Sequence, residues 1–241
     1  AYLSSVSALK IGCGYCFLCS TERVIDAVSA QIQNIEFVPK KDVLLHLADC
    51  DVVEIGCGLS QTEEAVRIFE QILNSCPQNL PLIIDADGLN IISKDPEKFL
   101  SKGFSSAIFT PHPKEAARLL NCSLEDVLAD VRLAAGKICA KYQCITVLKT
   151  HRTVVMSPGG RFYENTTGNN SMAKAGSGDV LCGMITGLTA QGTELFEAAA
   201  LGVYLHGLSG DLAAEKLTAY SVMAEDLISF IPNAVKLYLN N

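Results

Sequence analysis

The sequence has no excess of positive charge and no long uninterrupted apolar run. Lys and Arg number 19 against 26 Asp and Glu, which gives a formal net charge of -7 and a pI near 5.1. Nucleic acids and anionic membranes are therefore excluded as partners, and any phosphate ligand must be held by local groups. The longest uncharged apolar stretch of the C-terminal half, residues 180–190, falls well short of the ~20 residues that cross a bilayer.

The first residues of the chain do not have the pattern of a signal peptide, and the cysteines do not have the spacing of a small disulfide scaffold. Its ten cysteines predict free thiols in a reducing compartment, the cytoplasm. Cys13, Cys16 and Cys19 form a C-x-x-C-x-x-C run that could suggest an iron–sulfur or zinc site. We interpret residues 15–19 as a short strand, on which residues three apart point to opposite faces, so these thiols should not converge. We assign no metal ligands from the sequence.

Short apolar runs alternate with longer helical patterns, which is typical of a parallel sheet covered by helices on both faces. The expected strands are 15–19, 52–55, 82–85, 107–110 and 144–148, followed by a hairpin of 153–156 with 161–164. The expected helices are 22–33 after a Thr21 cap, a helix capped by Ser60 to about 75, one from Ser123 to about 141, and an almost all-helical part from Asp179 onward.

Residues 1–11 have the pattern of a helix, with no Met and no capping residue before it. Since an α/β domain normally opens with a strand, we expect that the N-terminal strand of this domain is missing. No internal repeat or low-complexity linker interrupts the chain. We therefore expect one domain over residues 1–241, truncated at its N-terminus.

Ligands of open parallel sheets bind at the carboxyl ends of the strands. Five segments follow apolar runs at such positions, and we call them the strand-end segments: 55–60, 85–90, 110–115, 149–153 and 167–179. The last opens a helix with Gly176-Ser177-Gly178-Asp179, whose amides could approach a phosphate in the favourable field of a helix N-terminus. Asp179 would then be placed to take a proton from a hydroxyl nucleophile. Spacing alone also allows a plain helix start, in which Asp179 complements the helix dipole.

Neither standard nucleotide-binding motif is present. The turn at Gly176 lacks the Gly-Lys-Ser/Thr of a Walker A loop, and Gln61 stands where a dinucleotide fingerprint needs its third glycine.

Together the strand-end segments resemble the ATP- or ADP-dependent NAD(P)H-hydrate dehydratases of the ribokinase-like fold. That family has, in the same order, Gly-Pro-Gly-Leu-Gly, Asp-Ala-Asp-Ala-Leu-Asn, Thr-Pro-His-Pro-Gly-Glu, Lys-Gly-x-x-Thr and Gly-Asn-x-Gly-Met-Ala-x-x-Gly-Ser-Gly-Asp. Residues 110–119 depart from it at Lys114 and residues 168–181 at Ser171, while Cys57 replaces a proline and Thr150 a glycine. The resemblance implies a three-layer α/β/α fold with a mostly parallel central sheet.

The resemblance further implies a repair reaction, in which a hydrated nicotinamide ring loses water at the expense of ATP or ADP, with Mg²⁺. It implies that Asp179 is the base and that the nucleotide contacts Lys149, Thr150, His151, Arg152, Thr153, Gly176, Ser177 and Gly178. It implies that the hydrated dinucleotide contacts Ala1, Gly58, Asn90, His112, Asn169 and Asp179. The resemblance also implies that the chain forms a homo-oligomer, a tetramer. It implies an epimerase domain as a partner, either fused or separate.

Two other functions stay open. A vitamin-precursor kinase would share the fold and the Gly-x-Gly-Asp but would release ADP and a stable phosphorylated product. A non-catalytic module would bind nucleotide without turnover, as a result of the substitutions at Thr150 and Ser171. Some single residues could have a structural role and no role in binding. His112 could end a strand, Asp87 could cap a helix, and His46, His151 and His206 could be surface or packing residues.

Overall fold

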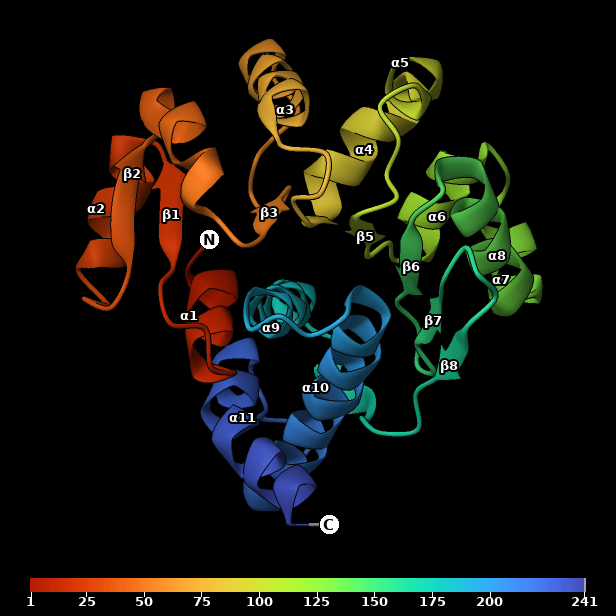
Figure 1. The fold of residues 1–241 in the computed structure, drawn as a ribbon. Coiled ribbons are helices and arrows are strands. Elements are labelled where there is room, and N and C mark those ends of the chain that lie inside the picture. The colour runs from red at the N-terminus through yellow and green to blue at the C-terminus, as the bar shows by residue number, and fades with distance from the viewer. Residues whose placement is uncertain (241) are drawn as a thin grey trace.

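The computed structural model describes residues 1–240, which form three layers with a mostly parallel sheet in the middle (Figure 1). The sheet contains six strands in the order in which they follow along the chain: β3 (Val53–Ile55), β4 (Leu82–Ile84), β5 (Ala107–Phe109), β6 (Ile145–Leu148), β7 (Val154–Met156) and β8 (Phe162–Glu164). Strands β3 to β6 are parallel, whereas β7 pairs antiparallel with both of its neighbours. The expected fold class and the expected late hairpin are confirmed.

One face of the sheet is covered by helices from the middle of the chain. They are α3 (Glu63–Ser75), α4 (Ala86–Lys94), α5 (Pro96–Leu100), α6 (Pro113–Leu120), α7 (Leu124–Ala129) and α8 (Val131–Tyr142). Helices α9 (Ser177–Ala190) and α10 (Leu195–Leu217) cover the other face (Figure 1). Because side chains alternate along a strand, Ile84 and Phe109 pack under the first set, and Ile83 and Ile108 pack under the second.

A helical layer extends the second face. Helices α1 (Tyr2–Lys10) and α11 (Ala224–Leu239) pack against α9 and α10 around a separate apolar cluster that includes Val180 and Met184. Helix α1 approaches α9 so closely that a Cβ at Gly183 would overlap the carbonyl of Ser4, so only glycine fits there. The start of α1 is thereby held beside α9. Within residues 1–240, no helix combines the length and the apolar character that crossing a bilayer requires.

The expected first strand exists but does not join the central sheet, so that part of the prediction was wrong. Strand β1 (Phe17–Ser20) pairs in parallel with β2 (Glu36–Pro39), a strand that the apolar pattern did not indicate. They form a separate two-stranded sheet with α2 (Glu22–Ser29), and a 3₁₀ helix, η1 (Lys40–Asp49), leads from it to β3 (Figure 1). Strand β1 has no fully buried residue, because it belongs to this small outer sheet.

Three helix predictions also need correction. The helix expected over 22–33 ends at Ser29. Thr62, and not Ser60, caps α3, because Ser60 has a left-handed backbone (φ 68°) while the Thr62 hydroxyl accepts a hydrogen bond from Ala65 N. The helix expected over 123–141 is broken between α7 and α8 at Asp130, whose extended backbone ends one helix and whose carboxylate accepts a hydrogen bond from Leu133 N to begin the next.

Candidate active site

The register of the sheet brings the strand-end segments together. Ile55 pairs with Ile84, and Ile84 pairs with Phe109, so β3, β4 and β5 end at the same level. Backbone hydrogen bonds continue past the ends, from Asp85 N to Ile55 O and from Thr110 N to Ile84 O. The segments that follow these strands therefore lie side by side at one edge of the sheet, where parallel sheets bind their ligands.

A buried ion pair stands at this edge. The Lys149 ammonium lies 2.7 Å from Asp85 Oδ1 and 3.0 Å from Oδ2, and the two side chains are 18% and 3% exposed respectively. Burial disfavours the ammonium, but the carboxylates of Asp85 and Glu115 outweigh burial and raise the pKa of Lys149. Lys149 is thus a permanent positive charge at neutral pH, held at a fixed position by Asp85.

The N-terminus of α9 faces this ion pair. Gly176 precedes the helix with a left-handed backbone (φ 90°), a conformation that favours glycine. A Cβ placed on Gly178 would lie 3.4 Å from Lys149 Nζ and 4.0 Å from Asp85 Oδ2. The first amides of α9 and the Lys149 ammonium therefore border the same small space, and both favour an anion there. We call this space the anion hole.

Asp179 stands in the first turn of α9, beside the anion hole, and it is partly exposed. Its carboxylate and that of Asp85 both lie close enough to Cys57 for their charges to raise the pKa of that thiol. Asp179 and Asp85 are thus both near the strand-end turn at Cys57. A carboxylate in this position can accept a proton from a hydroxyl group that attacks a bound phosphate.

The other residues of segment 149–153 form a turn with one another. The Thr150 hydroxyl donates to Arg152 O at 2.8 Å and accepts from Arg152 N at 3.2 Å, and the Thr153 hydroxyl donates to Thr150 O. Arg152 pairs with Glu164 at 3.1 Å, and His151 is exposed. Of this segment, Lys149 is the residue whose charged end reaches the anion hole.

His112 caps helix α6, rather than simply ending a strand. Its Nδ1 accepts hydrogen bonds from Lys114 N and Glu115 N, and the Glu115 carboxylate accepts one from His112 N at 2.9 Å. The side chain is still 45% exposed, so part of the ring remains open to a ligand. Burial and the charge of Lys149 lower the pKa of His112, so the imidazole is neutral at pH 7.

Sequence reasoning gave Asp85 little weight and did not single out Glu115. Burial is the main cause that raises the pKa of Glu115 to about 7, while the Lys149 charge opposes the rise and the Asp85 charge adds to it. The signal for Asp85 is its position directly after the buried strand β4, which matches the position of Lys149 directly after β6. The signal for Glu115 is the capping box that begins α6.

Gly58 and Asp87 lie in and beside the turn of Gly56, Cys57 and Gly58 that follows β3, which we call the glycine turn. Gly58 is exposed with φ 73°, and a Cβ there would have no atom within 4 Å, so the space above it is open. Asp87 is not a helix cap, because Asp85 occupies the N-cap position of α4. Instead the Asp87 carboxylate accepts hydrogen bonds from Ser60 N and Gln61 Nε2 and fixes the turn after β3.

Asn90 and Asn169 are both engaged by their neighbours. Asn90 Oδ1 accepts a hydrogen bond from Arg118 at 2.7 Å. Asn169 Oδ1 caps the 3₁₀ helix η2 (Asn170–Met172), and its Nδ2 donates to Asp211 on α10 at 2.8 Å. These bonds hold Asn169 on the chain that leads into α9.

The remaining predicted contacts lie around the start of α9. Ala1 directly precedes α1, and a Cβ on Gly176 would meet the nearby Leu3 side chain at 2.5 Å. Ser177 is buried, and its hydroxyl lies 3.3 Å from His206 Nε2. His206 is a buried packing residue of α10, which agrees with the expectation that it is a surface or packing residue.

The sheet order, the helical layers and an anion hole at a helix N-terminus together indicate a nucleotide-dependent enzyme class of the ribokinase-like α/β fold. The family of NAD(P)H-hydrate dehydratases matches residues 1–233, so this chain belongs to that family and the resemblance inferred from the motifs is confirmed.

Curated relatives and a solved structure agree with this assignment. An ADP-dependent (S)-NAD(P)H-hydrate dehydratase from Neisseria meningitidis serogroup B is 40% identical, over 88% of this chain and 72% of its own length. A bifunctional NAD(P)H-hydrate repair enzyme from Moorella thermoacetica is 41% identical, over 80% of this chain. The crystal structure of ADP/ATP-dependent NAD(P)H-hydrate dehydratase from Bacillus subtilis, co-crystallized with ATP/Mg²⁺, superposes with a TM-score of 0.84 at 26% identity, covering 99% of this chain and 84% of that one.

The match to the Moorella enzyme covers 36% of that protein's length, so the chain corresponds to a part of such bifunctional relatives.

Proposed function

We propose that this domain dehydrates the hydrates of NADH and NADPH back to the reduced dinucleotides, at the expense of a nucleoside di- or triphosphate. The observation that carries the proposal is the convergence of Lys149 and the α9 N-terminus at Gly178, with Asp179 beside them. This arrangement suits transfer of a phosphoryl group to a hydroxyl, because it supplies a base and a fixed positive field.

In the proposed mechanism, Asp179 accepts the proton of the ring hydroxyl as its oxygen attacks the terminal phosphorus of the nucleotide. A new O–P bond forms, and the bond from phosphorus to the bridging oxygen breaks. The amides at Gly178 and the Lys149 ammonium stabilise the charge that develops on the transferred group. The phosphate ester then leaves the ring as orthophosphate with the C–O electron pair, and loss of a proton from the adjacent carbon restores the double bond.

The donor groups present fit Mg²⁺, which prefers oxygen ligands and is usually held by substrate phosphates with one or two carboxylates. Asp85 and Asp179 are the carboxylates around the anion hole, and both affect the same Cys57 thiol through their charges. Asp85 would hold the ion, directly or through water, against the nucleotide phosphates, which leaves Asp179 to act as the base. When bound, the ion would neutralise phosphate charge.

Ligand contacts are proposed for two groups of residues. The nucleotide would be held by Lys149, Thr150, His151, Arg152, Thr153, Gly176, Ser177 and Gly178. The hydrated dinucleotide would be held by Ala1, Gly58, Asn90, His112 and Asn169. Support comes from the open space over Gly58 and the partly exposed ring of His112, which both border the strand-end edge.

We further propose a cytoplasmic homotetramer that works together with an epimerase domain, fused or separate. The family resemblance supports the tetramer, and the bifunctional names of relatives support a second activity on the same chain or a partner. Light scattering on the purified protein tests the assembly, for which a mass of about 26 kDa would be a monomer and would contradict it.

The activity is tested with chemically prepared NADH hydrate, Mg²⁺ and either ATP or ADP. The expected result is growth of the absorbance of reduced nicotinamide together with release of one orthophosphate per molecule restored. A stable phosphorylated product without new absorbance would instead identify a small-molecule kinase. Nucleotide binding without either product would identify a non-catalytic module.

A further inference from the structure

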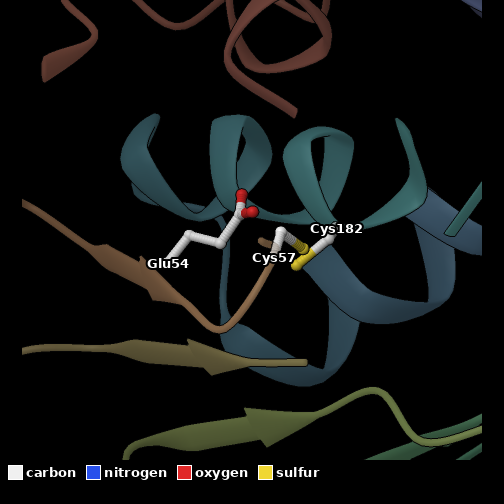
Figure 2. A group of neighbouring side chains, drawn as sticks. All are labelled: Glu54, Cys57 and Cys182. Atoms are coloured by element: carbon white, nitrogen blue, oxygen red, sulfur yellow. The ribbon is translucent and has the colours of Figure 1, made fainter. Parts of the chain in front are cut away.

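Two thiols and a carboxylate converge behind the glycine turn, on side chains that the proposed reaction does not use. Glu54 belongs to β3, Cys57 to the turn after it, and Cys182 to α9 (Figure 2). The carboxylate oxygen and the two sulfur atoms all lie within 4.8 Å of one another. Figure 2 shows the three side chains pointing into the same space between β3 and α9. This Glu54–Cys57–Cys182 cluster is far from contiguous in sequence, so no motif spacing could have indicated it.

The carboxylate of this cluster is held in place by hydroxyl groups. Ser4 Oγ lies 2.6 Å from both oxygens of Glu54 and donates to them, and Thr186 Oγ1 donates to Glu54 Oε2 at 3.1 Å. The donors come from α1 and α9, which enclose the carboxylate from two sides. Hydrogen-bonded partners of this kind orient the ligands of protein metal sites.

The surroundings of the thiols favour a cation. Cys182 is buried, and its thiol is in contact with that of Cys57. The contact with Cys182 favours the Cys57 thiolate, but burial and the neighbouring carboxylates outweigh it and raise the pKa of Cys57 to about 12. Burial likewise raises the pKa of Glu54. Each group is thus disfavoured as an isolated anion, and a divalent cation would relieve that cost for all three together.

We propose that Glu54, Cys57 and Cys182 form a binding site for a thiophilic divalent cation such as Zn²⁺. Zn–S bonds of about 2.3 Å and Zn–O bonds of about 2.0 Å place tetrahedral ligand atoms roughly 3.5 Å apart, which small side-chain shifts would achieve here. Binding releases the two thiol protons to solvent, so affinity rises with pH. Asp85 Oδ2 lies 4.0 Å from Cys57 Sγ but is paired with Lys149, so water would be the fourth ligand.

This site differs in chemistry from the Mg²⁺ site proposed with the nucleotide. Thiolate ligands select Zn²⁺ and Cd²⁺, whereas Mg²⁺ is bound through oxygen. The bound ion would join the turn at Cys57 to α9, next to the Asp85–Lys149 pair. Its presence does not depend on the proposed dehydratase activity.

The test uses Cd²⁺ alone as the probe, added to the full chain after reduction and removal of the reductant. We expect one Cd²⁺ per chain with thiolate-to-metal charge-transfer absorption, and displacement by Zn²⁺. Cys57→Ala and Cys182→Ala should each weaken this binding at least about a hundredfold, since even outer partners of metal ligands are worth roughly 10- to 100-fold. Glu54→Gln should weaken it by roughly tenfold or more but keep the charge-transfer band.

Cys122→Ala is the matched control, because Cys122 is an exposed thiol outside the cluster. It should bind Cd²⁺ as the parent does. The proposal is overturned if the reduced parent shows no charge-transfer band at one equivalent, or if Cys57→Ala and Cys182→Ala bind like Cys122→Ala. Circular dichroism of each variant accompanies the titration. If Cys182→Ala does not fold, Cys57→Ala decides the outcome, because it changes a turn rather than a packed helix face.

Discussion

The Lys149 ammonium lies 2.7 Å from Asp85 Oδ1, and a methyl group at Gly178 would come within 3.4 Å of the same nitrogen. The Lys149 ammonium is thus held in place by the Asp85 carboxylate, and its positive charge favours a phosphate in the space next to Gly178. Because Asp85 fixes the ammonium before any ligand arrives, little side-chain entropy remains to be lost when a nucleotide binds.

Removing the carboxylate should therefore affect stability. Asp85→Asn leaves the Lys149 ammonium without its partner in a largely buried position, and we expect a loss of about 3 kcal/mol in the free energy of unfolding. The double variant Asp85→Asn with Lys149→Met should recover at least half of that loss, because no unpaired charge remains. Urea denaturation measures both.

The matched control for this prediction is Glu70→Gln, which breaks the more exposed pair with Lys98. Pairs of that kind contribute about 0–1 kcal/mol, so the control should change stability little. A loss for Asp85→Asn as small as that of the control would show that the buried pair does not hold the site together.

Gly178→Ala tests the anion hole without breaking the fold. Gly178 lies in the first turn of α9, where alanine fits the backbone, but its methyl group would occupy the space beside Lys149 Nζ. We expect the melting temperature to be retained and the affinity for ADP to fall at least about tenfold, an effect of roughly 1.4 kcal/mol. Isothermal titration calorimetry measures the affinity.

Gly14→Ala is the control for that change, since a Cβ there would have no atom within 4 Å. ADP affinity should be unaffected by it. If Gly178→Ala bound ADP as tightly as Gly14→Ala did, the phosphates would have to lie somewhere other than the space between α9 and Lys149.

The parts of the structure that the sequence predicted are those set by local pattern. The runs that became β4 and β5 are continuous apolar segments followed by polar residues, so both the strands and their functional ends could be located. The break at Asp130 was missed because the apolar pattern continues across it, and only the backbone of Asp130 interrupts the helix. Strand β2 was missed because it is short and pairs in an outer sheet that covers no large core.

In the candidate site, too, some residues could be located from local pattern, whereas others depend on contacts between distant segments. The position of Gly178 and Asp179 in the first turn of a helix could be predicted from motif and position, and a helix N-terminus carries its own anion-binding property, while their roles stay predictions. The partnership of Asp85 with Lys149 depends on the adjacency of segments far apart in the chain, which sequence pattern does not contain. The capping role of His112 also emerged only from its hydrogen bonds to Lys114 N and Glu115 N.

The stability of the fold should depend on pH through His206. Burial is the main cause that lowers the pKa of His206 to about 4, against an ordinary value of 6.5. Between these values the unfolded chain binds more protons than the folded one, so this contribution is fully present above about pH 6.5 and is lost as the pH falls toward 4. The loss amounts to roughly 3 kcal/mol.

His206→Gln should flatten this dependence, when unfolding free energies are measured between pH 4 and pH 7. His151→Gln is the control, because His151 is exposed, and it should keep the slope of the parent. Equal slopes for the parent and both variants would mean that His206 is protonated as readily in the folded protein as in the unfolded chain.

The central claim is that Asp179 is the base of a nucleotide-dependent dehydration. The measurement that tests it most directly is the kcat of Asp179→Asn for NADH hydrate, with hydrate and nucleotide saturating and with the ADP affinity of the variant determined in parallel. General-base catalysis contributes roughly 10²- to 10⁴-fold, so we predict a turnover at least about a hundredfold lower, with nucleotide affinity nearly unchanged. A variant that retained more than about a tenth of the parent kcat would contradict the claim, since the removal of a general base costs more than that.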